Sequence, residues 1–313
     1  MTIQQLEYVV AVDKYRHFVN AAEACNVTQP TLSMMIQKLE EELDAKIFDR
    51  SALPIKPTPI GKHVIEQACV ALRHFNLVRE IVEQEQNVAK GSFQLGIIPT
   101  IAPYIVPELL HRQTNDSGNV ELVIKENPTA ILIEELLSGA IDGALMAGPL
   151  HHPKLIEYPL YYEKFYAYVS PNDKAFKKRS VDIDKVDLHN LWLLENVHCF
   201  RGQIERLCQM KQKLLAANQS VKYEAGSIDT LIHIVDCNNG MTVIPEMSAM
   251  GLSEEKQENL RTFKNLTAVR EVSLVVSEEY IRKTILHTIM DMIRNVVPKS
   301  MQNKDLKKFV VEL

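Results

Sequence analysis

The stretch TQPTLSMMIQKLEEELDAKIFDR, residues 28–50, decides the fold of the first part of the chain. Its apolar residues recur at the spacing of one helical face: Leu32, Met35, Ile36, Leu39 and Leu43. Because Pro30 falls in the first turn, where a helix tolerates proline, we expect a helix over residues 29–43. The neighbouring residues predict two shorter helices before it, at 2–15 and 17–27, and a two-stranded wing in the proline-rich segment 47–59.

Helices in this order are typical of a helix-turn-helix, in which the second helix of the motif enters the major groove of DNA. Amide and hydroxyl groups near its N-terminus can read base edges. The candidate base-reading residues are Gln29, Pro30, Thr31, Ser33, Met34 and Gln37. The candidate phosphate contacts are Lys38, Arg50, Lys56 and Thr58, with Arg16 and Lys62 as further candidates.

The charge of this segment leaves an alternative open. Residues 1–66 hold seven Lys or Arg against nine Asp or Glu, so the segment is not basic as a whole. The acidic excess lies largely at the far end of the helix 29–43, in Glu40, Glu41, Glu42 and Asp44. On these residues alone, a protein-docking module is as good an interpretation as a DNA-binding one.

Residues 59–88 predict one long helix. Apolar residues follow steps of four and three along it: Val64, Ala68, Ala71, Phe75, Val78 and Val82. Such a heptad pattern favours a helix that pairs with its twin in a dimer. The alternative is a helix that lies on its own domain.

From Gly91 onward, strand patterns alternate with helix patterns, as in VELVIKE followed by TAILIEELLSG. FYAYVS, residues 165–170, and LWLLE, residues 191–195, are further strand patterns. This alternation predicts α/β sheets covered by helices. The span is too long for one small sheet, so we expect two α/β lobes.

Composition excludes several classes of protein. The 313 residues are 46% hydrophobic and 24% charged, as in soluble globular proteins, and the net charge of −5 restricts any DNA contact to a local surface. No apolar run approaches the ~20 residues that a membrane span needs, and the N-terminus lacks the features of a signal peptide. We therefore expect a cytoplasmic protein without a membrane partner. Five cysteines without metal-site spacing predict no disulfide framework, metal or cofactor.

The segment HCFRGQIERLC, residues 198–208, carries the most informative chemistry. Cys199 lies beside His198 and Arg201, and nearby cations favour the reactive thiolate. If this segment were one helix, the Cα atoms of Cys199 and Cys208 would lie ~13.5 Å apart, whereas a disulfide needs them within ~7 Å. A bond between them would therefore require the helix to unwind, which Gly202 would ease. The alternative is that both cysteines are inert, buried residues.

The segment LEYVVAVDKYRHFVNAAEACNVTQPTLSMMIQKLEEELDAKIFDR, residues 6–50, resembles the winged helix-turn-helix of LysR-type transcriptional regulators. The resemblance implies a DNA-binding domain at 1–58, a dimerising linker helix at 59–88 and a redox-sensing regulatory domain at 89–313. That domain would resemble periplasmic binding proteins, with lobe I at about 91–161 and 268–300 and lobe II at about 162–267. The implied assembly is a homodimer or homotetramer on double-stranded DNA, with RNA polymerase as a further partner.

Nearly the whole chain resembles the peroxide-responsive members of this family, which also place a cysteine nine residues after an HC pair. The resemblance implies that hydrogen peroxide oxidises Cys199 to a sulfenic acid and that Cys208 resolves it as an intramolecular disulfide. Glutaredoxin or thioredoxin would reduce that bond. Thr100, Thr129, His198 and Arg270 correspond to residues of the peroxide pocket. Position 202 departs from the pattern, because such regulators often have aspartate where this chain has Gly202.

Two other functions remain open at this point. A regulator of the same fold could respond to a small molecule bound between the lobes, with the cysteines as bystanders. A thiol peroxidase would turn over peroxide repeatedly, but the helix-turn-helix argues against this class, so we do not expect an enzyme.

Overall fold

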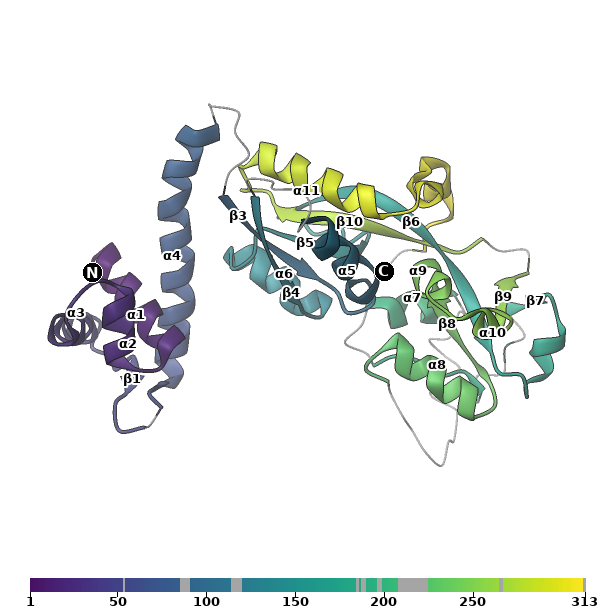
Figure 1. Cartoon of the computed structure of the whole chain (residues 1–313), viewed down its shortest axis with the longest axis horizontal. Helices are drawn as coiled ribbons and strands as arrows, with labels where there is room; N and C mark the ends of the chain where they lie inside the picture. Colours follow the sequence, from purple (N-terminus) through teal and green to yellow (C-terminus); the bar gives the residue numbers. More distant parts are fainter. Residues whose placement is uncertain are drawn as a thin grey trace. The chain divides into compact units, whose positions relative to one another are not determined.

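The computed structural model contains two compact units (Figure 1). The first unit is formed by residues 1–88 and the second by most of residues 89–313. The structure describes residues 1–52, 54–84, 91–113, 120–183, 186, 190–195, 199–207, 225–264 and 267–311.

The first unit begins with three helices and a two-stranded wing, as predicted. The helices are α1 (Ile3–Tyr15), α2 (Phe18–Ala24) and α3 (Gln29–Glu42). The wing strands β1 (Phe48–Asp49) and β2 (Lys56–Pro57) pair antiparallel. Helix α2 is shorter than the predicted 17–27, because Asn26 adopts a left-handed conformation with φ of 55° that a helix cannot continue.

Helix α4 (Pro59–Gln84) completes the first unit. The Thr58 hydroxyl oxygen accepts a hydrogen bond from the backbone N–H of Gly61 at 2.9 Å and so caps the start of the helix. Gly61 has no room for a side chain, since an added Cβ would lie 1.9 Å from the carbonyl oxygen of Ile47. This close approach fixes α4 against the wing.

The predicted heptad pattern of α4 has two parts. Ala68 is buried in the core of its own unit and Val64 packs against that core, so this part of the helix lies on its own domain. Further along, Phe75 is 45% exposed and Val78 is 61% exposed. Only the second part of the pattern is therefore available for a partner helix. No helix in the described part of the chain is long and apolar enough to cross a bilayer.

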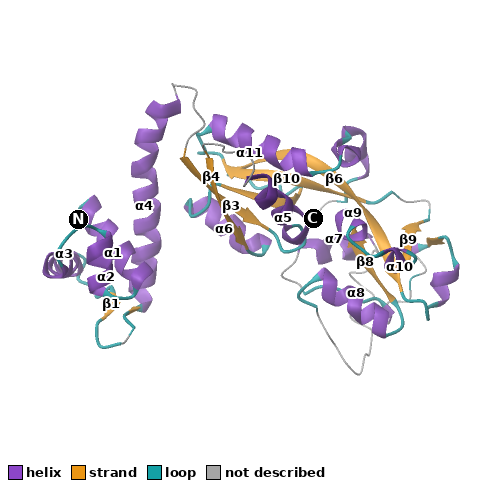
Figure 2. Ribbon diagram, in the orientation of Figure 1, coloured by secondary structure: helices purple, strands orange, loops and turns teal. Residues whose placement is uncertain are grey.

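A mixed sheet runs through the second unit in the order β4-β3-β5-β10-β6-β9-β7, with β8 also paired to β6 (Figure 2). Its strands are β3 (Gly91–Ile97), β4 (Val120–Glu126), β5 (Gly143–Gly148), β6 (Leu155–Val169), β7 (Ser180–Val181), β8 (Met241–Pro245), β9 (Leu260–Phe263) and β10 (Val269–Ser277). Strand β3 runs parallel to β4 and β5, whereas β10 runs antiparallel to β5 and β6. The α-helices in the described part of the second unit are α5 (Ala102–Gln113), α6 (Thr129–Ser138), α7 (Cys199–Leu207), α8 (Ile228–Cys237), α9 (Glu246–Met250), α10 (Glu254–Gln257) and α11 (Lys283–Val296). The described part of this unit also contains the 3-10 helices η1 (Lys174–Lys177), η6 (Lys299–Gln302) and η7 (Lys304–Phe309).

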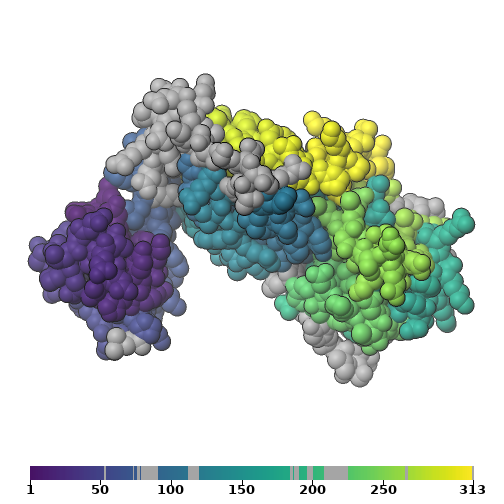
Figure 3. Space-filling model, in the orientation of Figure 1, coloured from purple at the N-terminus to yellow at the C-terminus, as the bar shows by residue number. Residues whose placement is uncertain are grey.

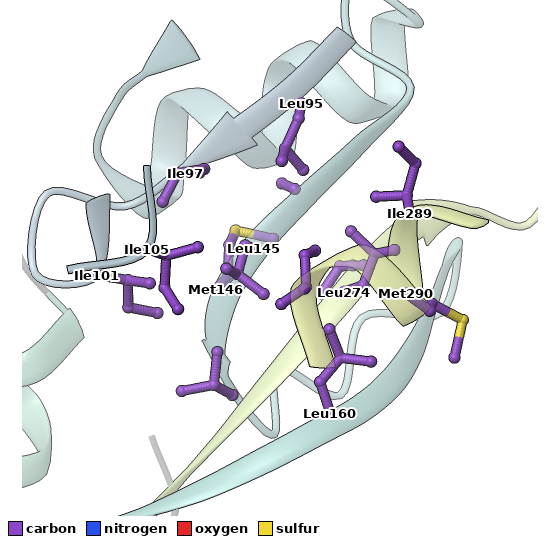
Figure 4. Close-up of a cluster of buried hydrophobic side chains, with 14 of the residues drawn as sticks. Leu95, Ile97, Ile101, Ile105, Leu145, Met146, Leu160, Leu274, Ile289 and Met290 are labelled. Carbon is purple, nitrogen blue, oxygen red and sulfur yellow. The ribbon is translucent and has the colours of Figure 1, made fainter. Parts of the chain in front are cut away.

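The long strand β6 joins two hydrophobic cores, and we call the regions around them lobe I and lobe II. Residues 155–164 of β6 pair with β10, and residues 165–169 pair with β8. In lobe I, apolar residues of β3, β5 and β10 pack with those of α5 and α11 (Figure 4). Gly96 lies against Leu132 of α6, so this helix covers the opposite face of the sheet. In lobe II, the end of β6 and β8 pack with α7 and α8.

Two details of the strands differ from the prediction. The apolar run LWLLE was expected to be a strand, but its residues make only isolated bridges, Leu191 to Met241 and Leu194 to Ala225. Conversely, the sequence indicated only the end of β6, FYAYVS. Pro159 and several charged residues interrupt its first part, and the register with β10 shifts there between Val272 and Ser273. Such a bulge accommodates a proline inside a sheet.

Candidate functional site

A buried ion pair lies where lobe I meets lobe II. Arg270 of β10 and Glu163 of β6 are direct cross-strand partners. In β6, Glu163 lies between Tyr161 of the lobe I core and Phe165 of the lobe II core. The Nε and Nη2 atoms of Arg270 each lie 2.9 Å from Oε2 of Glu163, and the two side chains are 0% and 1% exposed. The predicted site residue Arg270 is therefore held in one orientation by the neighbouring strand.

Thr100 is the second predicted site residue in this cluster. It follows β3 in the turn that leads to α5, and it accepts two hydrogen bonds from Arg270. The Nη1 atom donates to Oγ1 at 3.0 Å, and Nη2 donates to the carbonyl oxygen at 3.1 Å. Because arginine has only donors, Oγ1 of Thr100 must be the acceptor, and its own hydroxyl proton can be donated elsewhere.

Helix α7 brings the predicted sensing segment to the same cluster. Phe200 is fully buried, and its ring centroid lies 5.5 Å from the guanidinium carbon of Arg270. The ring also packs edge-on against Phe165, with 5.5 Å between the centroids. Since α7 starts at Cys199, its first turn lies beside the Arg270 cluster. His198, Cys208 and the side chain of Cys199 lie outside the described residues.

Side chains in the remainder of α7 form hydrogen bonds within the helix and to neighbouring segments. Arg201 donates to Glu205 at 2.9 Å and to the carbonyl oxygen of Leu194 at 3.0 Å. Its charge was expected to favour the thiolate of Cys199, but Glu205 balances part of that charge. Gln203 is fully buried, and its Nε2 donates to the carbonyl oxygen of Val311 at 3.2 Å.

Thr129, the third predicted site residue within the described chain, opens α6. Its hydroxyl oxygen is buried and has no hydrogen-bond partner among the described residues. A buried hydroxyl without a partner is costly, and its presence in a native fold calls for an explanation such as a bound molecule. Thr129 therefore lies outside the hydrogen-bond network that joins Thr100 to Arg270.

Burial dominates the electrostatics of this cluster. It raises the pKa of Glu163, although the charge of Arg270 acts in the opposite direction. The pKa of the fully buried Tyr161 hydroxyl is raised well above its usual value by burial and by the nearby Glu163 carboxylate. Glu163 and Phe200 were not among the residues predicted from the sequence. A glutamate within the apolar strand LYYEKFYAYV was the available signal for Glu163, because a charge there requires a buried partner.

In the first unit, α3 carries most of the predicted base-reading residues at the surface. Gln29, Pro30, Thr31, Met34 and Gln37 are exposed, as are Lys38 and Lys56 among the predicted phosphate contacts. Other predicted contacts are engaged within the unit. Arg50 donates to Ser33 at 3.1 Å and to Glu40 at 3.3 Å, and Gln37 donates to Glu41 at 2.9 Å. The Thr58 hydroxyl donates to the carbonyl oxygen of Lys46 at 2.6 Å.

Glu40, which belongs to the acidic run at the end of α3, is a further residue that the sequence did not single out. Its side chain is buried, and Oε1 accepts from the backbone N–H groups of Ile47 at 2.8 Å and Phe48 at 3.2 Å. Its other oxygen lies 3.4 Å from Nζ of Lys46. One carboxylate thus joins α3 to the first wing strand and to Arg50.

Comparison with known proteins assigns the class. Residues 3–62 match the description "Bacterial regulatory helix-turn-helix protein, lysR family", and residues 86–298 match "LysR substrate binding domain". The chain therefore belongs to the LysR family of bacterial transcriptional regulators, and it is a regulator rather than an enzyme. In the described part of the chain, no three His, Cys, Asp or Glu side chains are grouped as metal ligands would be.

Within this family the chain is similar to OxyR. It is 30% identical over 256 residues to the "Hydrogen peroxide-inducible genes activator" of Haemophilus influenzae, covering 82% of this chain and 84% of the relative. It is also 30% identical to the "DNA-binding transcriptional dual regulator OxyR" of Escherichia coli, covering 79% and 80%. Full-length OxyR C199D from Pseudomonas aeruginosa superposes with a TM-score of 0.72 at 30% identity, covering 94% of this chain and 98% of that one.

Proposed function

We propose that this chain is a hydrogen peroxide-sensing, DNA-binding transcriptional regulator that is switched by a reversible disulfide between Cys199 and Cys208. The observation that carries the proposal is the start of α7 at Cys199, with Phe200 packed against the Arg270–Thr100 cluster. The similarity to peroxide-inducible activators and to OxyR supports the choice of signal.

Two balanced steps would operate the switch. The Cys199 thiolate attacks one oxygen of hydrogen peroxide, the O–O bond breaks, and the departing hydroxide takes up a proton to become water. The Cys208 thiolate then attacks the sulfur of the Cys199 sulfenic acid, the S–O bond breaks, and the departing hydroxide takes up a proton to become a second water. One peroxide is reduced and two thiols are oxidised to one disulfide.

The described residues offer groups for the first step. Thr100 can donate its hydroxyl proton to a peroxide oxygen, because Arg270 occupies the acceptor side of that hydroxyl. The positive end of the α7 helix dipole lies at Cys199 and favours its thiolate. We assign Thr129 to the same pocket because its buried hydroxyl lacks a partner among the described residues, and His198 by its position beside Cys199.

The second step requires α7 to change shape. From Cys199 to Leu207 the helix advances about 12 Å, at ~1.5 Å per residue, whereas a disulfide joins Cα atoms within ~7 Å. Bond formation to the residue after Leu207 must therefore unwind part of α7. Gly202, near the middle of the helix, makes the unwinding easier by up to ~1 kcal/mol. Oxidation at sulfur becomes a change of shape in lobe II.

The DNA interface would be formed by the exposed N-terminal part of α3 and by the wing. Gln29, Pro30, Thr31, Ser33, Met34 and Gln37 would face base edges, and Lys38, Arg50, Lys56 and Thr58 would face phosphates. The exposed half of α4 would pair two chains, and dimers would join as tetramers. RNA polymerase, together with glutaredoxin or thioredoxin as the reductant, completes the proposed set of partners.

The proposal is tested with DNA selected in vitro for binding to the reduced protein. One equivalent of hydrogen peroxide should change the DNase footprint of the wild type and leave that of Cys199→Ser unchanged. Cys208→Ser should form a dimedone-reactive sulfenic acid without the change of footprint. A Cys199→Ser protein that answers peroxide as the wild type does would refute the proposal.

A second candidate is regulation by a small anionic molecule. The observation that favours it is a cavity of about 780 Å³ in lobe II, whose lining includes Lys174, Lys178, Arg179 and Lys264 and the carboxylates of Asp173 and Asp182. Citrate is a suitable probe. A rise in melting temperature with citrate and a changed footprint without oxidant would favour this function over peroxide sensing.

A further inference from the structure

Glu163 carries no role in the proposed chemistry, yet it is one of the most deeply buried charges of the chain. Its Oε2 lies 2.9 Å from both Nε and Nη2 of Arg270. An isolated carboxylate in such a place would be very costly, and pairing with a guanidinium offsets that cost. The pair alone would explain stability, so a functional role must come from what its geometry does.

The geometry of the guanidinium divides its donors between two partners. Glu163 takes the edge that carries Nε and Nη2, which turns Nη1 toward Oγ1 of Thr100 at 3.0 Å. Nη2 also reaches the carbonyl oxygen of Thr100 at 3.1 Å, so the Thr100 backbone is held as well. Without this carboxylate the arginine could rotate, since its side chain has many rotamers and no other carboxylate pairs with it among the described residues.

The orientation of Arg270 sets the orientation of the Thr100 hydroxyl. While Nη1 donates to Oγ1, the hydroxyl proton must point away from Arg270. If Arg270 moved, the hydroxyl could rotate freely and would present a donor to peroxide only part of the time. An oriented donor that costs no reorganisation is what favours a departing anion.

We propose that Glu163 is a positioning residue for the oxidation of Cys199: it fixes Arg270 on Thr100, and Thr100 in turn donates to the departing peroxide oxygen. This inference rests on the proposed function. It adds a residue on β6, at the junction of the two cores, to the groups that determine how fast the sensor reacts.

Glu163→Gln is the variant that tests it, because glutamine keeps the size of the side chain and removes its charge. Breaking a buried ion pair also destabilises a fold, so a matched control is needed. Asp142 pairs with Arg282 in lobe I, with side chains that are 3% and 5% exposed, and it also accepts from the backbone N–H of Gln94. Asp142→Asn therefore damages a comparable pair at the start of β3, away from Thr100.

The readout is the second-order rate constant for oxidation of Cys199 by hydrogen peroxide in the full chain, followed by dimedone trapping in a Cys208→Ser background. Glu163→Gln should lower this constant about tenfold, somewhat less than the loss of a whole oriented donor. The rate of Cys199 alkylation by iodoacetamide should not fall, because alkylation needs no donor to peroxide. Asp142→Asn should lower the melting temperature without lowering either rate.

A double-mutant cycle with Thr100→Val separates positioning from a general loss of structure. If Glu163 acts through Thr100, Glu163→Gln should have no further effect on the peroxide rate once Thr100 is valine. If the two effects multiply instead, or if Asp142→Asn slows peroxide to the same degree, the inference is overturned.

The peroxide oxidation rate of Cys199 in the wild type separates a failure of the Glu163 role from a failure of the proposed function. If Cys199 reacts with peroxide quickly in both the wild type and Glu163→Gln, only the role of Glu163 fails. If wild-type Cys199 reacts no faster than the exposed Cys237, the proposed function fails together with the inference.

Discussion

Gln203 and Val311, which lie 108 positions apart, are joined by a hydrogen bond of 3.2 Å from the side-chain amide to the backbone carbonyl. The backbone N–H of Val311 donates in turn to the carbonyl oxygen of Val269 at 2.8 Å, one residue before Arg270. Val311 thus connects the buried face of α7 to the start of β10. The helices η6 and η7, which precede Val311 in the chain, lie in the yellow part of the surface in Figure 3. Unwinding of α7 would break this connection.

Amide hydrogen exchange should therefore detect the unwinding of α7, both in the helix and at the distant residue Val311. We expect the amides of residues 201–207 and of Val311 to exchange faster in the oxidised protein than in the reduced one, because the contact of Gln203 is lost. Mass spectrometry of peptic peptides measures this. Cys208→Ser treated with the same peroxide is the control, since it should retain α7. Unchanged exchange in the oxidised wild type would mean that the helix does not unwind.

Gly202→Ala should slow formation of the Cys199–Cys208 disulfide without slowing the oxidation of Cys199 to the sulfenic acid. An added Cβ at position 202 meets no atom of the described residues within 4 Å, so alanine fits without strain against them. It should stabilise α7 by up to ~1 kcal/mol and slow disulfide formation about fivefold. Stopped-flow quenching followed by peptide analysis separates sulfenic acid from disulfide. The prediction fails if both steps slow equally or neither does.

Thr129→Val should separate stability from reactivity. The Thr129 hydroxyl is buried without a partner in the described structure, so replacing it by a methyl group should leave the melting temperature unchanged or slightly higher. If the hydroxyl binds peroxide, the oxidation rate of Cys199 should nevertheless fall about a hundredfold, as for the loss of one oriented donor. A drop in melting temperature with an unchanged rate would assign Thr129 a structural role alone.

Glu40→Ala should destabilise the first unit. It leaves the N–H groups of Ile47 and Phe48 without their acceptor, at about 1–3 kcal/mol each. Calorimetry of the full chain should show the transition of this unit shifted down by roughly 10 °C or more. Glu41→Ala is the matched control on the next residue, since Glu41 is exposed and accepts from Gln37. Equal shifts for both variants would contradict the role of Glu40.

The sequence predicted those parts of the fold that depend on local patterns. Helix α3 and the wing follow from the spacing of Leu32, Ile36 and Leu39 and from the prolines after Arg50. The partners of Glu40 and Glu163 were not predicted, because the contacts of Glu40 depend on how the wing folds back on α3 and the partner of Glu163 is distant in sequence. Glu163 is 107 positions from Arg270. Only the folded chain shows that these two carboxylates are buried.

The resemblance supplied the candidate site where local patterns could not. It selected Thr100 and Arg270, and the structure brings these two together by hydrogen bonds across 170 positions. It did not indicate that Arg50 and Thr58 form hydrogen bonds within the first unit. Those contacts depend on the packing of α3, the wing and α4, which no single segment encodes.

The Cys199–Cys208 switch is tested most directly by peptide mapping of all five cysteines after one equivalent of hydrogen peroxide at neutral pH. Burial and the carboxylate of Glu7 raise the pKa of Cys25, so this thiol should stay protonated and unmodified, and it serves as the internal reference. If Cys199 and Cys208 form the switch, their free thiols should disappear together and a 199–208 crosslinked peptide should take their place. Oxidation of Cys69 or Cys237 in place of this pair, or loss of Cys199 without any crosslink to Cys208, would contradict it.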